Sequence, residues 1–193
     1  YTDIISAETK IPQYKKWILT SFRNNFQNNI KKDIWKHGDN KTLSDNIKNI
    51  FGYTIQLQKD FKVLRLDSLN SFVWLGRGIP YRWITLHKVD KNKIINQFSL
   101  WNNLESLYNN TLDSLIISNY YRKQTIEHSD KDRLIARGLY EHKESQTGGP
   151  FFVYIFDTKI NNEVILISGF VNNPGKSKLF LLKQLEQIAF SIK

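Results

Sequence analysis

The hydrophobic positions of the first fifty residues recur at the three- and four-residue spacing of amphipathic helices. From Gln13 to Trp35 this stripe predicts a long helix, and Pro12 suits its first turn. A shorter helix is predicted from Leu43 to Phe51, with Gly52 placed to end it. We therefore expect a helical N-terminal part over about residues 12–51.

After Gly52 the hydrophobic period changes to two, which is typical of strands. The predicted strands are Tyr53 to Gln58, Lys62 to Leu66, Phe72 to Leu75, Tyr81 to Val89, 132–142, 151–157 and 163–171. Further helices are predicted at about 96–114 and 177–192. The last two strands are apolar on both faces, so we place them at the centre of a sheet covered on each side, with Asn161-Asn162 as their hairpin turn.

Short connections between consecutive strands favour antiparallel pairing, so the predicted fold class is α+β, a mainly antiparallel sheet packed with several helices. The stretch FVWLGRG at 72–78 loosely echoes FVYIFDT at 152–158, and a weak strand-strand-helix duplication is kept as an alternative. A chain of 193 residues with 40% hydrophobic content fits one domain, 1–193, whose sheet-and-helix body spans about 53–193.

The amino-acid composition excludes several kinds of catalytic, metal-binding and crosslinking chemistry. The chain has no Cys, which excludes disulfides, thiolate zinc ligands and a Cys nucleophile. Its 28 Lys and Arg against 18 Asp and Glu give a net charge of +10, which could attract an anionic partner. The Lys residues are scattered rather than gathered in blocks, so we favour compositional drift in a chain rich in Asn, Lys and Ile over a selected binding surface.

Catalytic and metal-binding patterns are not found in the sequence. The histidines His37, His87, His128 and His142 have neither i, i+4 spacing nor acidic companions, so we predict no metal and no cofactor. No Gly-x-Ser-x-Gly elbow is present and no pair of carboxylates can be nominated, so no catalytic residue is proposed. No apolar run approaches the roughly 20 residues of a membrane span, and we expect any targeting segment to have been removed.

Two stretches interleave aromatic and cationic side chains, as do surfaces that stack on sugars or single-stranded nucleic acid. The candidate binding residues are Arg77, Tyr81 and Arg82 in the first stretch and Tyr120, Tyr121 and Arg122 in the second. Half of a strand faces the core, so Trp74 and Trp83 are expected to pack inside. The second stretch is placed in a loop. A solvated loop without a partner is the alternative for both.

The last third of the chain carries four motifs at short intervals. They are RGLYEHK at 137–143, GGPFFVYIFD at 148–157, ISGFVNNPGKSK at 167–178 and KQLEQIAFSI at 183–192. This series resembles a domain-of-unknown-function family (DUF4837-like) of envelope lipoproteins of the Bacteroidota, over about 45–193, the C-terminal portion of the family. The matching positions are Arg137, Gly138, Gly149, Pro150, Gly169, Pro174 and Glu186. Tyr140 stands where the family usually has Trp, so the chain is a divergent member.

The resemblance implies an extracytoplasmic setting, in the periplasm or at the outer membrane, and implies no activity. The leading hypothesis is a non-catalytic cell-envelope domain that binds another envelope protein, attached to a membrane only through an anchor absent from this chain. An enzyme acting on envelope polymers, a hydrolase or transferase, is the alternative, which a deep pocket gathering Arg137, Glu141, His142 and Glu163 would favour. Nucleic-acid binding is the least favoured hypothesis.

Two structural roles are predicted for the motif residues. Side chains alternate along a strand, so Arg137 should lie among core residues and needs a carboxylate partner, for which Glu186 and Glu141 are the candidates. We favour an ion pair that fixes the last helix on the sheet over a ligand-binding arginine. The stretch Gly148-Gly149-Pro150 is expected to be a tight turn that enters a central strand, with an anion-binding loop as the alternative.

Overall fold

The computed structural model describes residues 2–94, 100–113, 115–127, 133–142 and 146–193. The chain divides into two compact units, Tyr1–His37 and Gly38–Lys193, which are described separately. The expectation of one domain over 1–193 stays a prediction.

The first unit is a single helix, α1 (Thr2–Ile34). The predicted helix is therefore confirmed, but it begins earlier than its apolar stripe indicates, and Pro12 lies inside it rather than in its first turn. Two aromatic side chains of the stripe are largely exposed, Trp17 at 68% and Phe22 at 72%.

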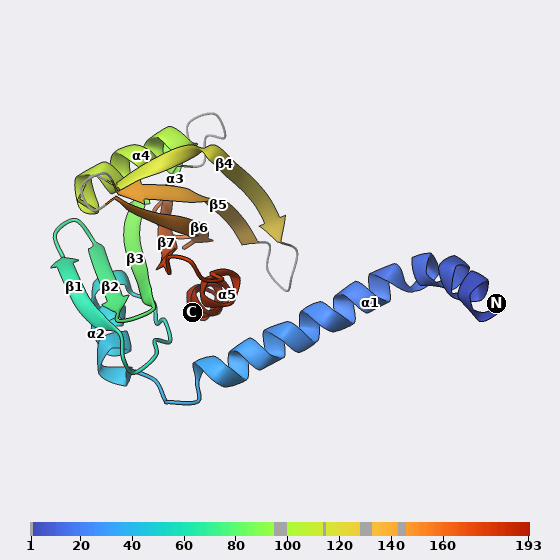
Figure 1. Ribbon diagram of the computed structural model, residues 1–193. Helices are drawn as coiled ribbons and strands as arrows, with labels where there is room; N and C mark the ends of the chain where they lie inside the picture. Colours follow the sequence, from blue (N-terminus) through green and yellow to red (C-terminus); the bar gives the residue numbers. More distant parts are fainter. Residues whose placement is uncertain (1, 95–99, 114, 128–132, 143–145) are drawn as a thin grey trace. The chain divides into compact units, whose positions relative to one another are not determined.

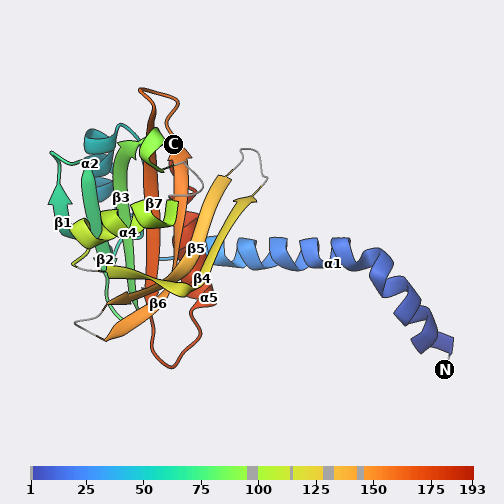
Figure 2. The same ribbon diagram turned by 90° about the horizontal axis from the view of Figure 1, so that it is seen from above.

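The second unit is built on a seven-stranded sheet in the order β1-β2-β3-β7-β6-β5-β4, in which every neighbouring pair is antiparallel (Figures 1 and 2). The strands are β1 (Lys62–Asp67), β2 (Phe72–Arg77), β3 (Tyr81–Asp90), β4 (Leu115–Glu127), β5 (Arg133–His142), β6 (Thr147–Asp157) and β7 (Glu163–Asn172). The α+β class and the antiparallel pairing are thus confirmed.

The hairpin of β6 and β7 lies at the centre of the sheet, as their apolar sequences predict. Its turn contains Asn161 and Asn162 with φ angles of 50° and 54°. Asn tolerates this left-handed region better than most residues, and positive φ at successive positions suits tight hairpin turns. The predicted turn is therefore confirmed.

The helices of the second unit are α2 (Lys41–Phe51), α3 (Lys91–Ile94), α4 (Leu100–Thr111) and α5 (Leu179–Ala189). In α2 the side chain of Asn40 accepts a hydrogen bond from the Leu43 N–H at 3.1 Å, and Gly52 ends the helix with a φ of 79°. Local capping therefore defines both ends of this helix.

Helices α4 and α5 cover opposite faces of the sheet (Figure 1). The Tyr108 hydroxyl on α4 bonds the hydroxyl of Ser168 at 2.7 Å. A Cβ on the next residue, Gly169, would lie 3.1 Å from Cβ of Leu185 on α5 and 2.3 Å from Cε1 of Phe152. Because neighbouring residues of a strand face opposite sides, β7 is enclosed by one helix on each side, and only glycine leaves α5 room to approach.

Three predicted segments are wrong. Tyr53 to Gln58 forms no strand beyond an isolated bridge from Gln58 to Asp39, because backbone groups of Thr54 bond those of Lys193 instead. The segment 120–123 lies in β4, not in a loop. The glycines and proline of 148–150 lie within β6, not in a turn.

Other predictions agree only in part. The helix predicted at 96–114 corresponds to α4, which begins at Leu100; residues 95–99 and 114 lie outside the described residues. A duplication would match β2-β3-α4 to β6-β7-α5. The two halves meet at the antiparallel β3–β7 pair. A twofold axis that relates these strands is perpendicular to the sheet and would place both helices on the same face. Helices α4 and α5 cover opposite faces, so the structure does not support the duplication.

Candidate ligand pocket

A cavity of about 330 Å³ lies on the α4 face of the sheet. Five of its lining side chains are aromatic, and they are Trp74, Tyr81, Trp83, Tyr140 and Phe170. Leu112 and Leu115, which follow the end of α4, form part of the wall. The pocket therefore occupies sheet surface beside the end of the helix that covers the rest of this face.

Strand register brings the aromatic residues together. Tyr81 pairs with Asn172 and Trp83 with Phe170 between β3 and β7, and Asn172 and Phe170 both line the pocket. The Tyr140 ring on β5 meets the Trp83 ring edge-on, with centroids 6.1 Å apart, and the Phe170 ring at 5.4 Å. Such edge-to-face contacts hold a ring in one orientation. The walls are thus preformed by neighbouring strands of the sheet.

Three polar atoms in these walls are buried and lack a hydrogen-bond partner in the part of the chain that the structure describes. They are Nε1 of Trp74, the hydroxyl oxygen of Tyr140 and Oδ1 of Asn172. The residues Tyr140 and Asn172 are only 2% and 9% exposed. A buried polar group without a partner costs about 1–3 kcal/mol, and native proteins retain few of them. Three of the six such atoms found in the described residues thus lie in the walls of this one pocket.

The pocket lining, which includes His142, contains no permanently charged side chain. The side chains that line it include none from Asp, Glu, Lys or Arg. Burial raises the pKa of Tyr140 above its ordinary value, so its hydroxyl keeps its proton. What the pocket presents is an apolar aromatic surface with a few neutral hydrogen-bonding groups, the usual composition of small-molecule sites.

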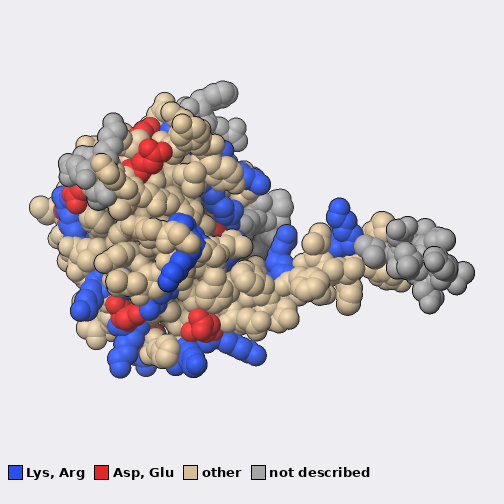
Figure 3. Space-filling model, in the orientation of Figure 1, with Lys and Arg blue, Asp and Glu red and all other residues tan. Residues whose placement is uncertain are grey.

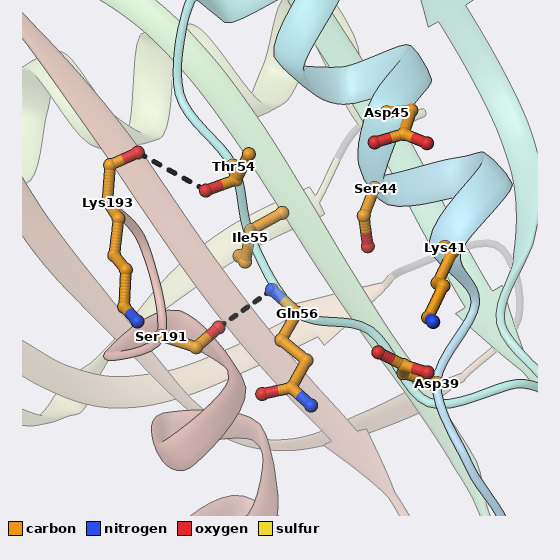
Figure 4. A pocket seen from close by; sticks show the side chains of 9 residues that line it. All are labelled: Asp39, Lys41, Ser44, Asp45, Thr54, Ile55, Gln56, Ser191 and Lys193. Atoms are coloured by element: carbon orange, nitrogen blue, oxygen red, sulfur yellow. Dashed lines mark hydrogen bonds between the residues drawn. The ribbon is translucent and has the colours of Figure 1, made fainter.

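A second hollow, of about 390 Å³, is polar in character (Figure 4). Asp39, Lys41 and Asp45 line it from the start of α2, facing Gln56 and Ser191. The Ser191 hydroxyl accepts a bond of 2.9 Å from the Gln56 N–H. None of the buried unpartnered atoms found in the described residues belongs to its lining. It therefore lacks the signal that distinguishes the aromatic pocket.

The first predicted binding stretch is divided by the structure. Arg77 forms an ion pair with Asp60 and donates a hydrogen bond of 2.8 Å to Gln58. Arg82 is buried, with 4% exposure, and bonds the side chain of Gln184. Tyr81, at 47% exposure, joins the aromatic pocket. Arg82 therefore lies inside the protein, not on an aromatic-basic surface.

The second predicted stretch lies on β4, at the edge of the sheet. Tyr120 is 93% exposed and Tyr121 46%. Arg122 donates hydrogen bonds to the carbonyls of Ile117 and Ser118 at 3.0 and 3.3 Å, across the irregularity in the β4–β5 pairing. Its guanidinium thus supports the strand, whereas the two tyrosines face solvent.

Arg137 contacts the partner that the sequence suggested. Its Nε lies 2.9 Å from Oε1 of Glu186 on α5, and Lys183 Nζ lies 2.6 Å from the other carboxylate oxygen. The Glu186 side chain is 2% exposed, so this carboxylate lies inside the protein between Arg137 and Lys183. The pair joins α5 to β5, while the other candidate partner, Glu141, is exposed.

The remaining motif residues have steric or turn positions. A Cβ on Gly138 would lie 2.7 Å from the Phe151 ring, and one on Gly149 would lie 2.1 Å from the Val171 carbonyl oxygen. Pro174 begins the turn before α5. These positions require small or rigid residues for packing.

The four residues named for the enzyme alternative do not gather. Arg137 faces α5, whereas His142 lines the aromatic pocket on the α4 face. Glu163 lies at the other end of β7, 3.9 Å from Lys88 Nζ. Across the described ranges, no group of three His, Asp or Glu side chains is arranged to hold a metal ion. On the face of the second unit seen in Figure 3, basic side chains are interspersed with acidic ones.

The fold and the pocket define an α+β domain with a preformed neutral cavity. The chain belongs to the family described as "Domain of unknown function (DUF4837)", which matches residues 40–191. This confirms the family resemblance of the motif series. No curated protein matches the chain. In the described part, no helix has both the length and the apolar character needed to cross a membrane.

Sequence reasoning missed the pocket as a site. Its aromatic residues alternate along separate strands, a pattern that also describes an ordinary core face, and the expectation that Trp74 and Trp83 pack inside followed from it. Both are half-buried pocket walls. The available signal was Tyr140, which stands where the family usually has Trp. Its contacts, however, depend on which strands become neighbours.

Arg137→Ala should lower the free energy of unfolding by about 3 kcal/mol, because it leaves the buried Glu186 carboxylate without its closest guanidinium partner. Lys159→Ala, which breaks the ion pair of an 81% exposed Lys159 with Asp157, should cost less than about 1 kcal/mol. Urea denaturation measures both. Equal losses would show that Arg137 does not fix α5 on the sheet.

Tyr140→Phe should leave the stability of the ligand-free protein unchanged or raise it by about 1 kcal/mol, because it removes a buried hydroxyl that has no partner among the described residues. Tyr108→Phe is the matched control: this tyrosine is also buried, but its hydroxyl bonds Ser168 at 2.7 Å, so its loss should destabilise by about 1–2 kcal/mol. Thermal and urea denaturation compare the two. A Tyr140→Phe variant as destabilised as Tyr108→Phe contradicts the assignment of an unpartnered hydroxyl.

Proposed function

We propose that this protein is a non-catalytic binding domain of the cell envelope and that the aromatic pocket is its ligand site. The observation that carries the proposal is the set of three buried, unpartnered polar atoms on Trp74, Tyr140 and Asn172 in otherwise apolar walls. Unpartnered polar groups cost stability, and a bound ligand that forms hydrogen bonds with them would offset that cost.

Binding is favoured over catalysis by the lining of the pocket. Hydrolysis of glycosidic bonds depends on a pair of carboxylates, and neither Asp nor Glu lines this pocket. The one buried carboxylate among the described residues, Glu186, is held by Arg137 and Lys183 and attaches α5 to the sheet. The pocket therefore offers a surface to occupy rather than acid and base groups to react with.

The cell-envelope setting is supported by the family resemblance, which is to envelope lipoproteins. We infer from it that the domain works in the periplasm or at the outer membrane. A domain there meets both small apolar molecules and other envelope proteins.

A titration with the neutral fluorophore N-phenyl-1-naphthylamine tests the pocket. We expect a saturable increase in fluorescence with one site per chain, and Leu115→Trp, which fills the cavity from its wall, should weaken binding at least about tenfold. Leu179→Trp is the matched control, since Leu179 is 59% exposed on α5 and outside the lining.

Unchanged melting temperatures would establish that both tryptophan variants are folded. No saturable binding to the wild-type protein, or equal binding by Leu115→Trp and Leu179→Trp, would overturn the proposed site.

A protein partner is the second candidate function, favoured by the exposure of Tyr120 and Tyr121 on the edge strand β4. Exposed tyrosines are common anchors of interfaces, and an edge strand presents unpaired backbone groups. Crosslinking in intact cells of the native bacterium should recover one stoichiometric envelope protein, and Tyr120→Ser should abolish its recovery. Leu69→Ser is the control, because Leu69 is exposed and lies beside β1, far along the sheet order from β4. This variant should recover the partner as well as the wild-type protein does. Equal recovery with both variants would remove β4 as the interface.

A further inference from the structure

We infer that the aromatic pocket selects an uncharged, mostly apolar small molecule that carries a hydroxyl group. This rests on the proposed function and adds the chemical class of the ligand. Three properties of the pocket lead to it: the absence of formal charge in its lining, the apolar character of its walls and the kinds of polar atom left without partners.

The ligand is uncharged because the pocket offers no counter-charge. Moving an ion from water into an apolar site is costly unless an opposite charge or several hydrogen bonds meet it. The lining contains no Lys or Arg to receive an anion and no Asp or Glu to receive a cation. Arg137 and Glu186 lie on the opposite face of the sheet, where they bond each other.

The ligand is mostly apolar because the walls are. Aromatic rings from β2, β3, β5 and β7 and two leucines make up most of the surface. The volume of about 330 Å³ is at the lower end of the roughly 300–1,000 Å³ typical of small-molecule pockets. One or two fused rings fit this size. A free sugar does not suit it, because many hydroxyls would find few partners there.

The polar group of the ligand follows from the three unpartnered atoms. The Trp74 Nε1–H can only donate a hydrogen bond, Oδ1 of Asn172 can only accept one, and the Tyr140 hydroxyl can do either. A ligand hydroxyl also donates and accepts, so it can bond whichever of these atoms it reaches. A quaternary ammonium group, which aromatic cages also attract, can neither donate nor accept and would leave all three unpartnered.

These atoms lie within the walls, so the ligand reaches them only when the side chains that carry them move slightly. The outer torsions of Asn and Trp are broad compared with those between tetrahedral carbons, whereas the Tyr140 hydroxyl lies on the axis of its outer torsion and is reached by a shift of the whole ring. This movement exposes groups that are unsatisfied in the closed wall, and hydrogen bonds to the ligand then stabilise the opened form.

Displacement of N-phenyl-1-naphthylamine by three matched probes tests this inference. The probes are naphthalene, 2-naphthol and 2-naphthoate, which share a ring system and differ in a hydroxyl or a carboxylate. At neutral pH we expect 2-naphthol to bind most tightly. Naphthalene should bind about 5- to 10-fold more weakly, the effect of roughly one net hydrogen bond, and the anionic 2-naphthoate more weakly than both.

Variants that keep the rings locate the effect. Tyr140→Phe and Trp74→Phe should each weaken 2-naphthol binding by about 3- to 10-fold and leave naphthalene binding within about twofold. Tyr53→Phe is the control, because the Tyr53 hydroxyl bonds the Thr158 carbonyl at 3.1 Å and the residue is outside the lining. It should change neither affinity.

The outcomes separate the two proposals. If the fluorophore binds and Leu115→Trp blocks it, but naphthalene binds as tightly as 2-naphthol or 2-naphthoate binds most tightly, the pocket stands and the inferred ligand class is wrong. If the Phe variants weaken both neutral probes equally, their role is in packing, and the assigned hydrogen bonds are wrong. If neither the fluorophore nor any naphthalene probe binds, the proposed function itself fails.

Discussion

The double burial of β7 is the constraint on which the rest of the second unit depends. Val164, Leu166 and Phe170 pack in the core under α4, while Ile165 and Ile167 are buried on the other face. A strand enclosed in this way gains from apolar burial on both sides and must be paired along both edges, here by β3 and β6. The register of these pairs then decides which side chains of the outer strands become neighbours.

The two faces of the sheet differ in how their polar groups are arranged around the covering helix. On the α5 face, Arg137 meets Glu186 and Arg82 meets Gln184, so polar side chains attach the helix to the strands. On the α4 face, Tyr108 bonds Ser168 and so attaches the helix in the same way, but beyond the end of the helix the polar atoms of Trp74 and Tyr140 have no partners among the described residues. Because side chains alternate along each strand, the residues that attach α5 and the residues that line the pocket lie on opposite faces of the sheet.

Much of the fold could be predicted because its strongest signals are local. The β6–β7 hairpin was identified from two apolar runs around Asn161-Asn162, and α2 from its stripe and the glycine that ends it. The strand β4 was missed because Tyr120, Tyr121 and Arg122 resemble an exposed loop, and the strand status of this segment depends on pairing with β5. The strand predicted at Tyr53 to Gln58 is wrong for the converse reason. Its apolar and polar residues do alternate, but the backbone of Thr54 bonds Lys193, after α5, instead of a strand of the sheet.

The pocket could not be predicted because it is a property of register and helix length together. Trp83 becomes a wall only because β3 pairs with β7 so that Trp83 is opposite Phe170, and Tyr140 reaches both from β5. Helix α4 ends at Thr111, and Leu112 and Leu115, which follow it, form only part of the pocket wall. The aromatic residues supply the surface, and the early end of α4 leaves it open. The proposed binding site is thus a consequence of incomplete coverage of the sheet, which accounts for unpartnered polar atoms in such an apolar environment.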